Sequence, residues 1–403
     1  MSTPRPLEGV VVLDLTRILA GPYATKLMAD LGARVVKVER PGGDRTRWAK
    51  PFLDDRPGIE RSGTFQYLNT NKESLVLDLR REGAGDVLPA LLQGADLVVS
   101  SFTPRQAERL GMTYEAIRAI ADRPMLWITN FGLAGPYRDY SMSDTTLFAM
   151  GGEMFSTGLA DREPLKYGGT AALLQCGAIA SVAGLGAIHA WELHDTAQLV
   201  EAPLFNGQLN NVDRRSAAIL AFRFSGRIQE RPPGPGSGLA GGVYEVADGY
   251  VEVTAAGGNY WQRFVEMIDD DALRDPIFAS PAAVAIPEAK ERCDAVVYPW
   301  MLTHTRADIW KKARKVHAMV APLYDAVDLF NDQNLRDRGF WTEIEHGESG
   351  TLPMIGRPYI LSETPWEIRR PAPRLGEHTD AILSELGFEN QAIASLRADG
   401  VVA

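Results

Sequence analysis

Hydrophobic positions in the first 130 residues alternate between short apolar runs and stretches with helical spacing. Residues 10–15 (VVVLDL) and 34–39 (RVVKVE) have the length and branched side chains of strands, and residues 18–32 between them place Leu, Ala and Met at helical spacing. The same pattern predicts strands at 74–79, 96–100 and 125–129, and helices at 83–94 and 114–122. Alternating strands and helices form parallel sheets through right-handed crossovers, so the fold class is α/β with a Rossmann-like domain.

The longest apolar stretch, residues 166–191, consists mainly of Ala, Gly, Leu, Ile and Val. Its five glycines from Gly168 onward would make a poor lipid-facing surface, which argues against a membrane span. Small side chains on every face instead predict a helix that packs against other backbones in a protein core. A core helix without any chemistry is the simpler alternative.

The pattern changes after residue 230. Residues 231–242 (RPPGPGSGLAGG) predict a linker, and the next segment predicts two strands joined by a tight turn at Asp248-Gly249, followed by a helix. A second, smaller α+β domain therefore begins here. It extends to about residue 320, after which residues 322–330 return toward the first domain.

Length and charge limit the functions that this chain can have. At 403 residues it exceeds one ordinary core, and its net charge of -10 with a pI near 5.3 argues against nucleic acid as a partner. Residues 1–81 nevertheless hold fourteen Lys and Arg against ten Asp and Glu, which fits either an anionic small ligand or a solvated surface. Cys176 and Cys293 offer no zinc spacing and no disulfide framework, so we expect a protein of the reducing cytoplasm.

A ligand site is expected at the carboxyl ends of the parallel strands. The first strand–helix turn, RILAGP, supplies one glycine where the dinucleotide fingerprint needs three. Arg40 follows the second strand, where an arginine commonly neutralises a phosphate on an adenosine ribose, as in NADP or coenzyme A, although a solvated arginine is an equal alternative. The candidate lining residues are Arg17, Arg40, Ser101, Phe102 and Phe131.

Several motifs together resemble the class III CoA-transferases, the family that includes formyl-CoA and carnitine CoA-transferases and the α-methylacyl-CoA racemases. The resemblance covers nearly the whole chain. It is carried by LDLTRILAGPYATKLMADLGARVVKVERPGGDRTR at 13–47, LNTNKESLVLDL at 68–79, ERLGM at 108–112, TNFGLAGPYRD at 129–139, DGYVEVTAAGGNYW at 248–261, RDRGF at 336–340, GRP at 356–358, LSETP at 361–365 and PAPRLGEHTD at 371–380.

The resemblance implies a Rossmann-like large domain formed by both chain ends, with an inserted small domain and two interlocked chains. The implied large domain covers residues 1–205 and 325–403, a linker covers 206–235, and the small domain with its return linker covers 236–324. The implied coenzyme A contacts are Leu19, Ala20, Arg40, Asn69, Asn71, Lys72, Phe102 and Arg109, and the implied substrate loop is Gly257, Gly258 and Asn259. Coenzyme A and acyl-CoA would be substrates, with no tightly bound cofactor and no metal.

The family's reaction needs an aspartate that attacks the acyl-CoA thioester. The resemblance places that aspartate four residues before Gly177, where this chain has Leu173, and no Asp or Glu occurs from Pro164 to Ala190. Ser101 replaces an asparagine that contacts coenzyme A in the family, and Ser143 replaces the histidine of the racemases. Leucine has no nucleophile, so catalytic residues are expected to be absent from this chain.

Another carboxylate could substitute for the missing nucleophile. The nearest in sequence are Asp144, Glu153, Asp161 and Glu201. Asp144 matches a structural aspartate of the family and is expected to cap or pair locally. Asp161 lies in a polar loop, where a solvated position is the default.

These residues favour the silent subunit of a heteromeric class III CoA-transferase, whose homologous partner carries the aspartate. By analogy with the succinyl-CoA:(R)-benzylsuccinate CoA-transferase of anaerobic toluene degradation, it would move coenzyme A between a dicarboxylyl-CoA and an organic acid. The alternatives are a silent CoA-binding or regulatory homodimer and an active homodimer with an unrecognised nucleophile. None of these hypotheses involves nucleic acid or a membrane.

Overall fold

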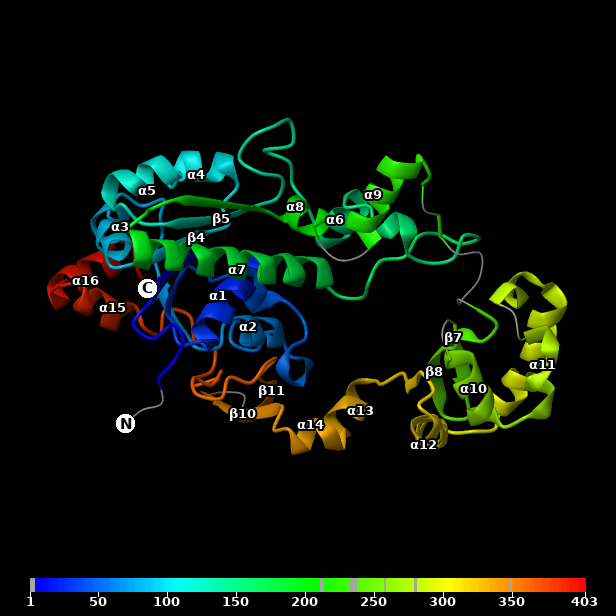
Figure 1. Ribbon diagram of the computed structural model, residues 1–403. Helices are drawn as coiled ribbons and strands as arrows, with labels where there is room; N and C mark the ends of the chain where they lie inside the picture. Colours follow the sequence, from blue (N-terminus) through cyan, green and yellow to red (C-terminus); the bar gives the residue numbers. More distant parts are fainter. Residues whose placement is uncertain are drawn as a thin grey trace. The chain divides into compact units, whose positions relative to one another are not determined.

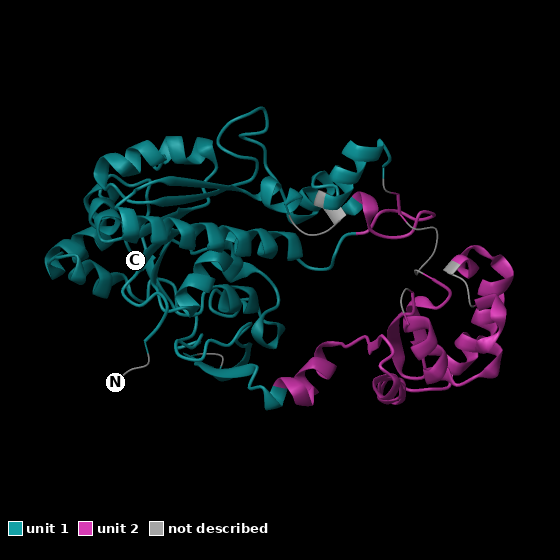
Figure 2. Ribbon diagram, in the orientation of Figure 1, with its two compact units in different colours: residues 1–154, 166–228, 336–403 teal, residues 155–165, 229–335 magenta. Residues whose placement is uncertain are grey.

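The structure is a computed structural model that describes residues 4–210, 214–228, 230–231, 238–256, 259–278, 281–347 and 350–403. The chain divides into two compact units (Figure 2). Unit 1 holds residues 1–154, 166–228 and 336–403, so both ends of the chain belong to it. Unit 2 holds residues 155–165 and 229–335. The domain limits that the family resemblance implies, at residues 205, 235 and 324, differ from the boundaries of these two units.

Unit 1 is built on a six-stranded parallel sheet with the order β3-β2-β1-β4-β5-β6. This is the strand order of Rossmann-like sheets, so the predicted α/β class is confirmed. Strand β3 begins two residues before the predicted segment, because Lys72 already pairs with Val35 of β2. The strands are β1 (Val11–Leu15), β2 (Arg34–Glu39), β3 (Lys72–Val76), β4 (Leu97–Ser100), β5 (Met125–Thr129) and β6 (Leu199–Pro203).

Helices cover both faces of this sheet (Figure 1). Successive strand residues point to opposite faces, so Val12 packs in the core beneath α1 and α7, whereas Leu13 and Leu15 pack in the core of the other face. The second face is covered by α3, α4, α5, α15 and α16. The bounds are α1 (Ala20–Asp30), α3 (Ala84–Gln93), α4 (Pro104–Leu110), α5 (Tyr114–Ile120), α7 (Ala171–His194), α15 (Thr379–Glu385) and α16 (Asn390–Ala398).

Helix α7 is the predicted small-residue helix, and its glycines allow close packing against α1. A Cβ atom on Gly177 would lie 2.5 Å from the carbonyl oxygen of Ala20 at the start of α1. The helix begins at Ala171 rather than at residue 166, because the Lys166 ammonium donates to the carbonyl oxygens of Tyr167 and Gly169 and holds this segment as a loop. In the described ranges, α7 is the one helix long and apolar enough to cross a membrane, but its buried residues pack in the core of unit 1.

A buried network of charged side chains joins β1, α1 and β3. The Lys72 ammonium lies 3.0 Å from the Asp14 carboxylate and 2.8 Å from both the Thr25 hydroxyl and the Pro22 carbonyl oxygen. Burial alone would raise the pKa of Asp14, but the ammonium groups of Lys72 and Lys37 and hydrogen bonds from Thr16 and Thr25 lower it to about 2. Asp14 and Lys72 are fully buried, so each charge depends on the other for its stability.

The remaining elements of unit 1 include a helix that the sequence pattern missed. Residues 206–235 were predicted as a linker, but α9 forms within them because its apolar and basic residues support a helix. The β10–β11 hairpin, which follows the small domain, was also not predicted. These elements are α2 (Gly63–Leu68), α6 (Asp144–Met150), α8 (Leu204–Leu209), α9 (Arg214–Ser225), β10 (Trp341–His346) and β11 (Gly350–Ile355), with α14 (Gln333–Asp337) at the limit between the units.

Unit 2 has its own core around a three-stranded sheet in the order β7-β8-β9. The predicted hairpin is present, with Gly249 at a φ of 143° in the turn. A third strand that the pattern missed, β9, pairs with β8. The elements are β7 (Gly241–Val246), β8 (Gly249–Thr254), α10 (Tyr260–Ile268), α11 (Pro287–Leu302), α12 (Arg306–Val316), β9 (Val320–Pro322) and α13 (Ala326–Asn331).

The first prediction concerns the buried network. Changing Asp14→Asn leaves the Lys72 charge buried without its carboxylate partner, and should lower the free energy of unfolding by about 3–5 kcal/mol. Chemical denaturation followed by circular dichroism measures this change. The matched control is Asp122→Asn, because Asp122 makes an exposed ion pair with Arg118. This substitution should change the free energy of unfolding by less than about 0.5 kcal/mol. Equal stabilities of the two variants would contradict this account.

Candidate functional site

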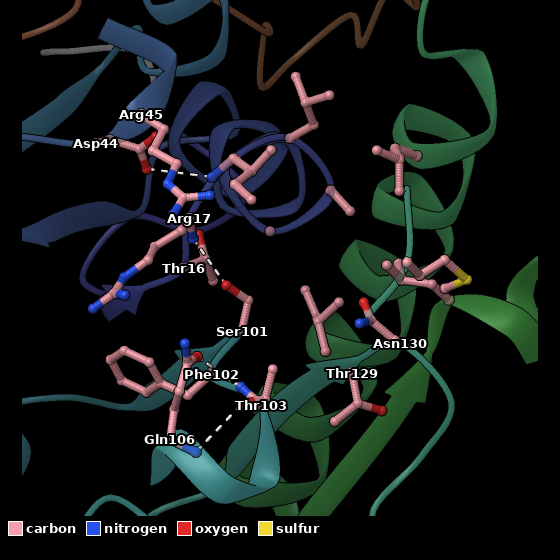
Figure 3. Close-up of a pocket in the computed structure, with 18 of the residues that line it drawn as sticks. Thr16, Arg17, Asp44, Arg45, Ser101, Phe102, Thr103, Gln106, Thr129 and Asn130 are labelled. Atoms are coloured by element: carbon pink, nitrogen blue, oxygen red, sulfur yellow. Dashed lines mark hydrogen bonds between the residues drawn. The ribbon is translucent and has the colours of Figure 1, made fainter. Parts of the chain in front are cut away.

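A cavity of about 610 Å³ opens at the carboxyl ends of the parallel strands in unit 1 (Figure 3). Its walls come from the turn between β1 and α1, the segments after β2, β4 and β5, and the beginning of α7. This is the expected position of a ligand site in a doubly wound sheet. Representative residues from these five segments are Arg17, Asp44, Ser101, Asn130 and Leu173.

One wall of the cavity carries three arginines, Arg17, Arg40 and Arg45. Burial, together with the like charges of Arg40, Arg45 and Arg80, lowers the pKa of Arg17, and Asp44 opposes this effect only in part. The Arg17 guanidinium lies 4.7 Å from the centre of the Phe102 ring, a distance at which a cation–π contact is favourable. Like charges gathered beside one cavity are stabilised by an anion, so this wall is suited to phosphate groups.

The turn that carries Arg17 is held in an unusual conformation. Ile18 has a φ of 73°, which is rare for a branched side chain and indicates strain that the surroundings maintain. The Arg17 amide donates to the Ser101 hydroxyl at 2.9 Å, and the Ile18 amide donates to the Asp44 carboxylate at 3.4 Å (Figure 3). The buried Lys37 ammonium donates to the Thr16 carbonyl oxygen at 3.1 Å and to Asp44 at 3.3 Å. Ser101 therefore fixes the turn.

The first turn of α7, at Leu173, and Asp144 form another part of the cavity lining. The Asp144 carboxylate accepts a hydrogen bond from the Leu173 amide at 3.2 Å and another from the Lys166 ammonium at 2.9 Å. Thr170, the residue before α7, makes no side-chain cap, so Asp144 caps this helix from α6. The expectation that Asp144 caps or pairs is confirmed, but the expectation that it does so locally is wrong, because its partners lie 22 and 29 positions away.

The structure brings part of the expected coenzyme A contacts to the cavity. Leu19, Ala20, Arg40 and Phe102 line it. Asn69, Asn71 and Lys72 do not line it and are fully buried. Arg109 lies in the last turn of α4 with its side chain exposed, also outside the lining.

The three buried residues have partners inside the protein. Asn69 accepts a hydrogen bond from the Lys72 ammonium at 3.0 Å. Asn71 donates to Asp30 at 2.7 Å, and its side-chain oxygen accepts from the Arg369 amide at 2.7 Å, which ties the C-terminal segment to the sheet. These bonds give the side chains a structural role, because they join β3 to α1 and to the C-terminal segment.

Other candidates lie elsewhere. Phe131 does not line the cavity and instead packs against Tyr137, Tyr140 and Phe205. Gly257 and Gly258 fall outside the described residues, and Asn259 precedes helix α10 of unit 2. Of the carboxylates considered as substitutes, only Asp144 lines the cavity. In the parts of the chain that the structure describes, no group of three or more His, Cys, Asp or Glu side chains could hold a metal ion.

Sequence reasoning missed the link between Asp144 and the start of α7. The two positions are 29 residues apart, and a lone aspartate after a serine reads as an ordinary helix start. No sequence signal pointed to this link, because Thr170 before α7 is a common N-cap residue, and only the structure shows that its side chain does not cap the helix. The strained Ile18 had no sequence signal, since its backbone conformation follows from contacts with Ser101 and Asp44.

Comparison with known proteins agrees with this geometry. The sequence model of CoA-transferase family III matches residues 7–379. The chain is 29% identical to the succinyl-CoA:(R)-benzylsuccinate CoA-transferase subunit BbsE of Thauera aromatica, covering 97% of each chain, and 31% identical to the formyl-CoA:oxalate CoA-transferase of Streptomyces avermitilis, covering 99% of this chain and 100% of the relative. Among solved structures, a CAIB/BAIF family protein from Brucella suis is similar with a TM-score of 0.84 and 28% identity, over 95% of this chain and 99% of that one.

The arginine wall gives the second prediction. We propose that Arg40 contacts the ribose phosphate of coenzyme A, so replacing Arg40 with Gln should lower the affinity for coenzyme A about tenfold and should reduce the preference for coenzyme A over 3′-dephospho-coenzyme A. Isothermal titration with both ligands measures the two constants. Arg118→Gln, which removes an exposed guanidinium outside the cavity, is the matched control. An unchanged preference in Arg40→Gln would rule out this contact.

Proposed function

Because this chain belongs to CoA-transferase family III, we propose that it is the subunit of a heteromeric CoA-transferase that lacks the nucleophile, and that a homologous partner chain supplies the aspartate. The two chains would interlock, as the family resemblance implies. Coenzyme A thioesters would be substrates rather than tightly bound cofactors.

One observation supports this proposal above the others. The first turn of α7 lies at the cavity and presents Leu173 where the resemblance expects the nucleophile. An alkyl side chain can neither attack a thioester nor carry a covalent acyl intermediate. The amide of the same residue is already bonded to Asp144, so the helix end is stabilised without a carboxylate of its own.

The choice of substrates rests on a relative. A protein of similar length and 29% identity is named as a subunit of succinyl-CoA:(R)-benzylsuccinate CoA-transferase. By that analogy, the complex would move coenzyme A between a dicarboxylyl-CoA such as succinyl-CoA and an organic acid such as benzylsuccinate. A shared fold does not define a substrate. The identity of the donor and acceptor acids is therefore proposed by analogy with this relative.

In the proposed complex, this subunit binds and orients coenzyme A, and the partner subunit supplies the nucleophile. The partner's aspartate would attack the thioester carbonyl, forming an acyl anhydride and releasing the coenzyme A thiolate. The arginine wall of this chain would retain the nucleotide end of a coenzyme A molecule while Asp144 holds the α7 end in place.

The third prediction tests this proposal by reconstitution. The purified chain should transfer coenzyme A from succinyl-CoA to benzylsuccinate at least about 100-fold more slowly than the same chain purified with its nearest encoded homologue, because only the complex contains a nucleophile. Product thioesters are measured by mass spectrometry. Changing the partner's aspartate to alanine should abolish transfer.

Two outcomes would contradict the proposal. Rapid transfer by this chain alone would show that it holds its own nucleophile. Binding of coenzyme A without transfer, alone or with any homologue, would favour the silent CoA-binding or regulatory homodimer.

A second candidate function is an active homodimer in which Asp144 is the nucleophile. It is favoured by the position of Asp144, whose carboxylate lines the cavity beside Leu173. The two hydrogen bonds that this carboxylate accepts oppose the idea, because they stabilise its charge and weaken it as a nucleophile.

The fourth prediction separates the two candidates by covalent trapping. After incubation of the complex with succinyl-CoA and hydroxylamine, peptide mass spectrometry should find the hydroxamate on the partner's aspartate and none on Asp144. Hydroxylamine converts acylated or thioesterified carboxyl groups to hydroxamates, so the modified residue identifies the nucleophile. A hydroxamate on Asp144 would establish the second candidate instead.

A further inference from the structure

A second cavity of about 520 Å³ lies in unit 1 next to the coenzyme A cavity. Its walls come from the segment before α2, from α2 itself, from the start of α7 and from β11. The apolar side chains among its lining residues are Leu19, Pro51, Phe52, Leu53, Leu68, Leu174, Leu352, Pro353, Met354 and Ile355.

The two cavities share a wall at the starts of α1 and α7. Leu19, which precedes α1, and Thr170, which precedes α7, line both cavities. Leu173 lines the first cavity and its neighbour Leu174 lines the second. The first turn of α7 therefore contributes one leucine to each cavity. A ligand that extends past Leu19 and Thr170 would occupy both cavities.

The second cavity offers few groups that could stabilise a charged ligand. Among the described residues that line it, Arg61 is the one charged residue. The guanidinium of Arg61 already donates to the Asp54 carboxylate at 3.0 Å and to the Leu53 carbonyl oxygen at 3.0 Å. A small dianion in this cavity would lose its hydration without gaining an unpaired cation. An alkyl or aryl group would gain from leaving water.

We propose that the second cavity receives the acyl group of the CoA thioester, and that this group bears an apolar portion of about six to eight carbons, such as a phenyl ring or an alkyl chain. The inference rests on the proposed function, because it assumes that the coenzyme A part lies in the first cavity. The thioester then lies beside Leu19 and Thr170, where the N-terminal end of α1, which has no side-chain cap, carries partial positive charge that suits a carbonyl oxygen.

This placement divides recognition of the thioester into two parts. The arginine wall selects the phosphates of coenzyme A, whereas the second cavity selects the acyl group by apolar area. An acyl group of one or two carbons would leave the second cavity unfilled. The subunit would accordingly favour the larger acyl partner of the transfer reaction.

The test uses stable thioether analogues, since they occupy the site without reacting. Isothermal titration of the purified chain should show S-octyl-coenzyme A binding at least about tenfold more tightly than S-methyl-coenzyme A, because each buried methylene is worth roughly fourfold in affinity. Replacing Leu352 with Trp fills the second cavity and should bring the ratio of the two affinities to within about twofold of one.

Controls keep the result interpretable. Thr351→Trp places the same side chain on the neighbouring exposed position of β11, outside the cavity lining, and should retain the tenfold ratio. Met354→Trp, on the same face of β11 as Leu352, is the second filling variant if Leu352→Trp does not fold, and circular dichroism checks the fold of each.

The outcomes distinguish the inference from the proposed function. Equal affinity for the two analogues, or a tenfold ratio that survives both filling variants, overturns the acyl cavity while coenzyme A binding stands. If neither coenzyme A nor any analogue binds, then the proposal that this chain holds coenzyme A fails, and the acyl cavity fails with it.

Discussion

The close approach of α7 to α1 is the constraint on which the site depends. At Gly177 the two helices are so near that a single added carbon would collide with the Ala20 carbonyl oxygen. This contact brings the first turn of α7 beside the turn between β1 and α1, and the two turns together form the shared wall of both cavities. The abundance of small residues in α7 is thus a requirement of packing that also determines where the site lies.

Buried charge gives the site a rigid base. Asp14, Lys72 and Lys37 lie beneath the β1–α1 turn, and Lys37 bonds both the Thr16 carbonyl oxygen and Asp44. Hydrogen bonds in a low-dielectric interior are strong and geometrically demanding, so this base tolerates little movement. It supports the strained Ile18 and holds Arg17 at the cavity, which is the kind of preorganisation that anion binding needs.

The α7 end shows how a carboxylate from another helix can stabilise a helix that has Leu173 in its first turn. A helix that loses a carboxylate from its first turn also loses a favourable interaction with its own dipole. Here Asp144 supplies a carboxylate from α6, and Lys166 balances its charge. The cavity therefore keeps its shape around an apolar Leu173, and an inner wall that bears alkyl side chains on both sides is compatible with binding an apolar acyl group.

The sequence by itself determined the strand and helix alternation, the small-residue helix and the arginine after β2, because local periodicity and the order of residues along the chain encode these features. The same alternation determined the α/β class. The family resemblance drew attention to Leu173 as the position where a nucleophile is expected. The sequence did not determine the capping of α7 by Asp144, the burial of Asn69, Asn71 and Lys72, or the second cavity. Each of these depends on residues that are distant along the chain, such as Leu174 and Leu352, and only packing of the folded chain brings such residues together.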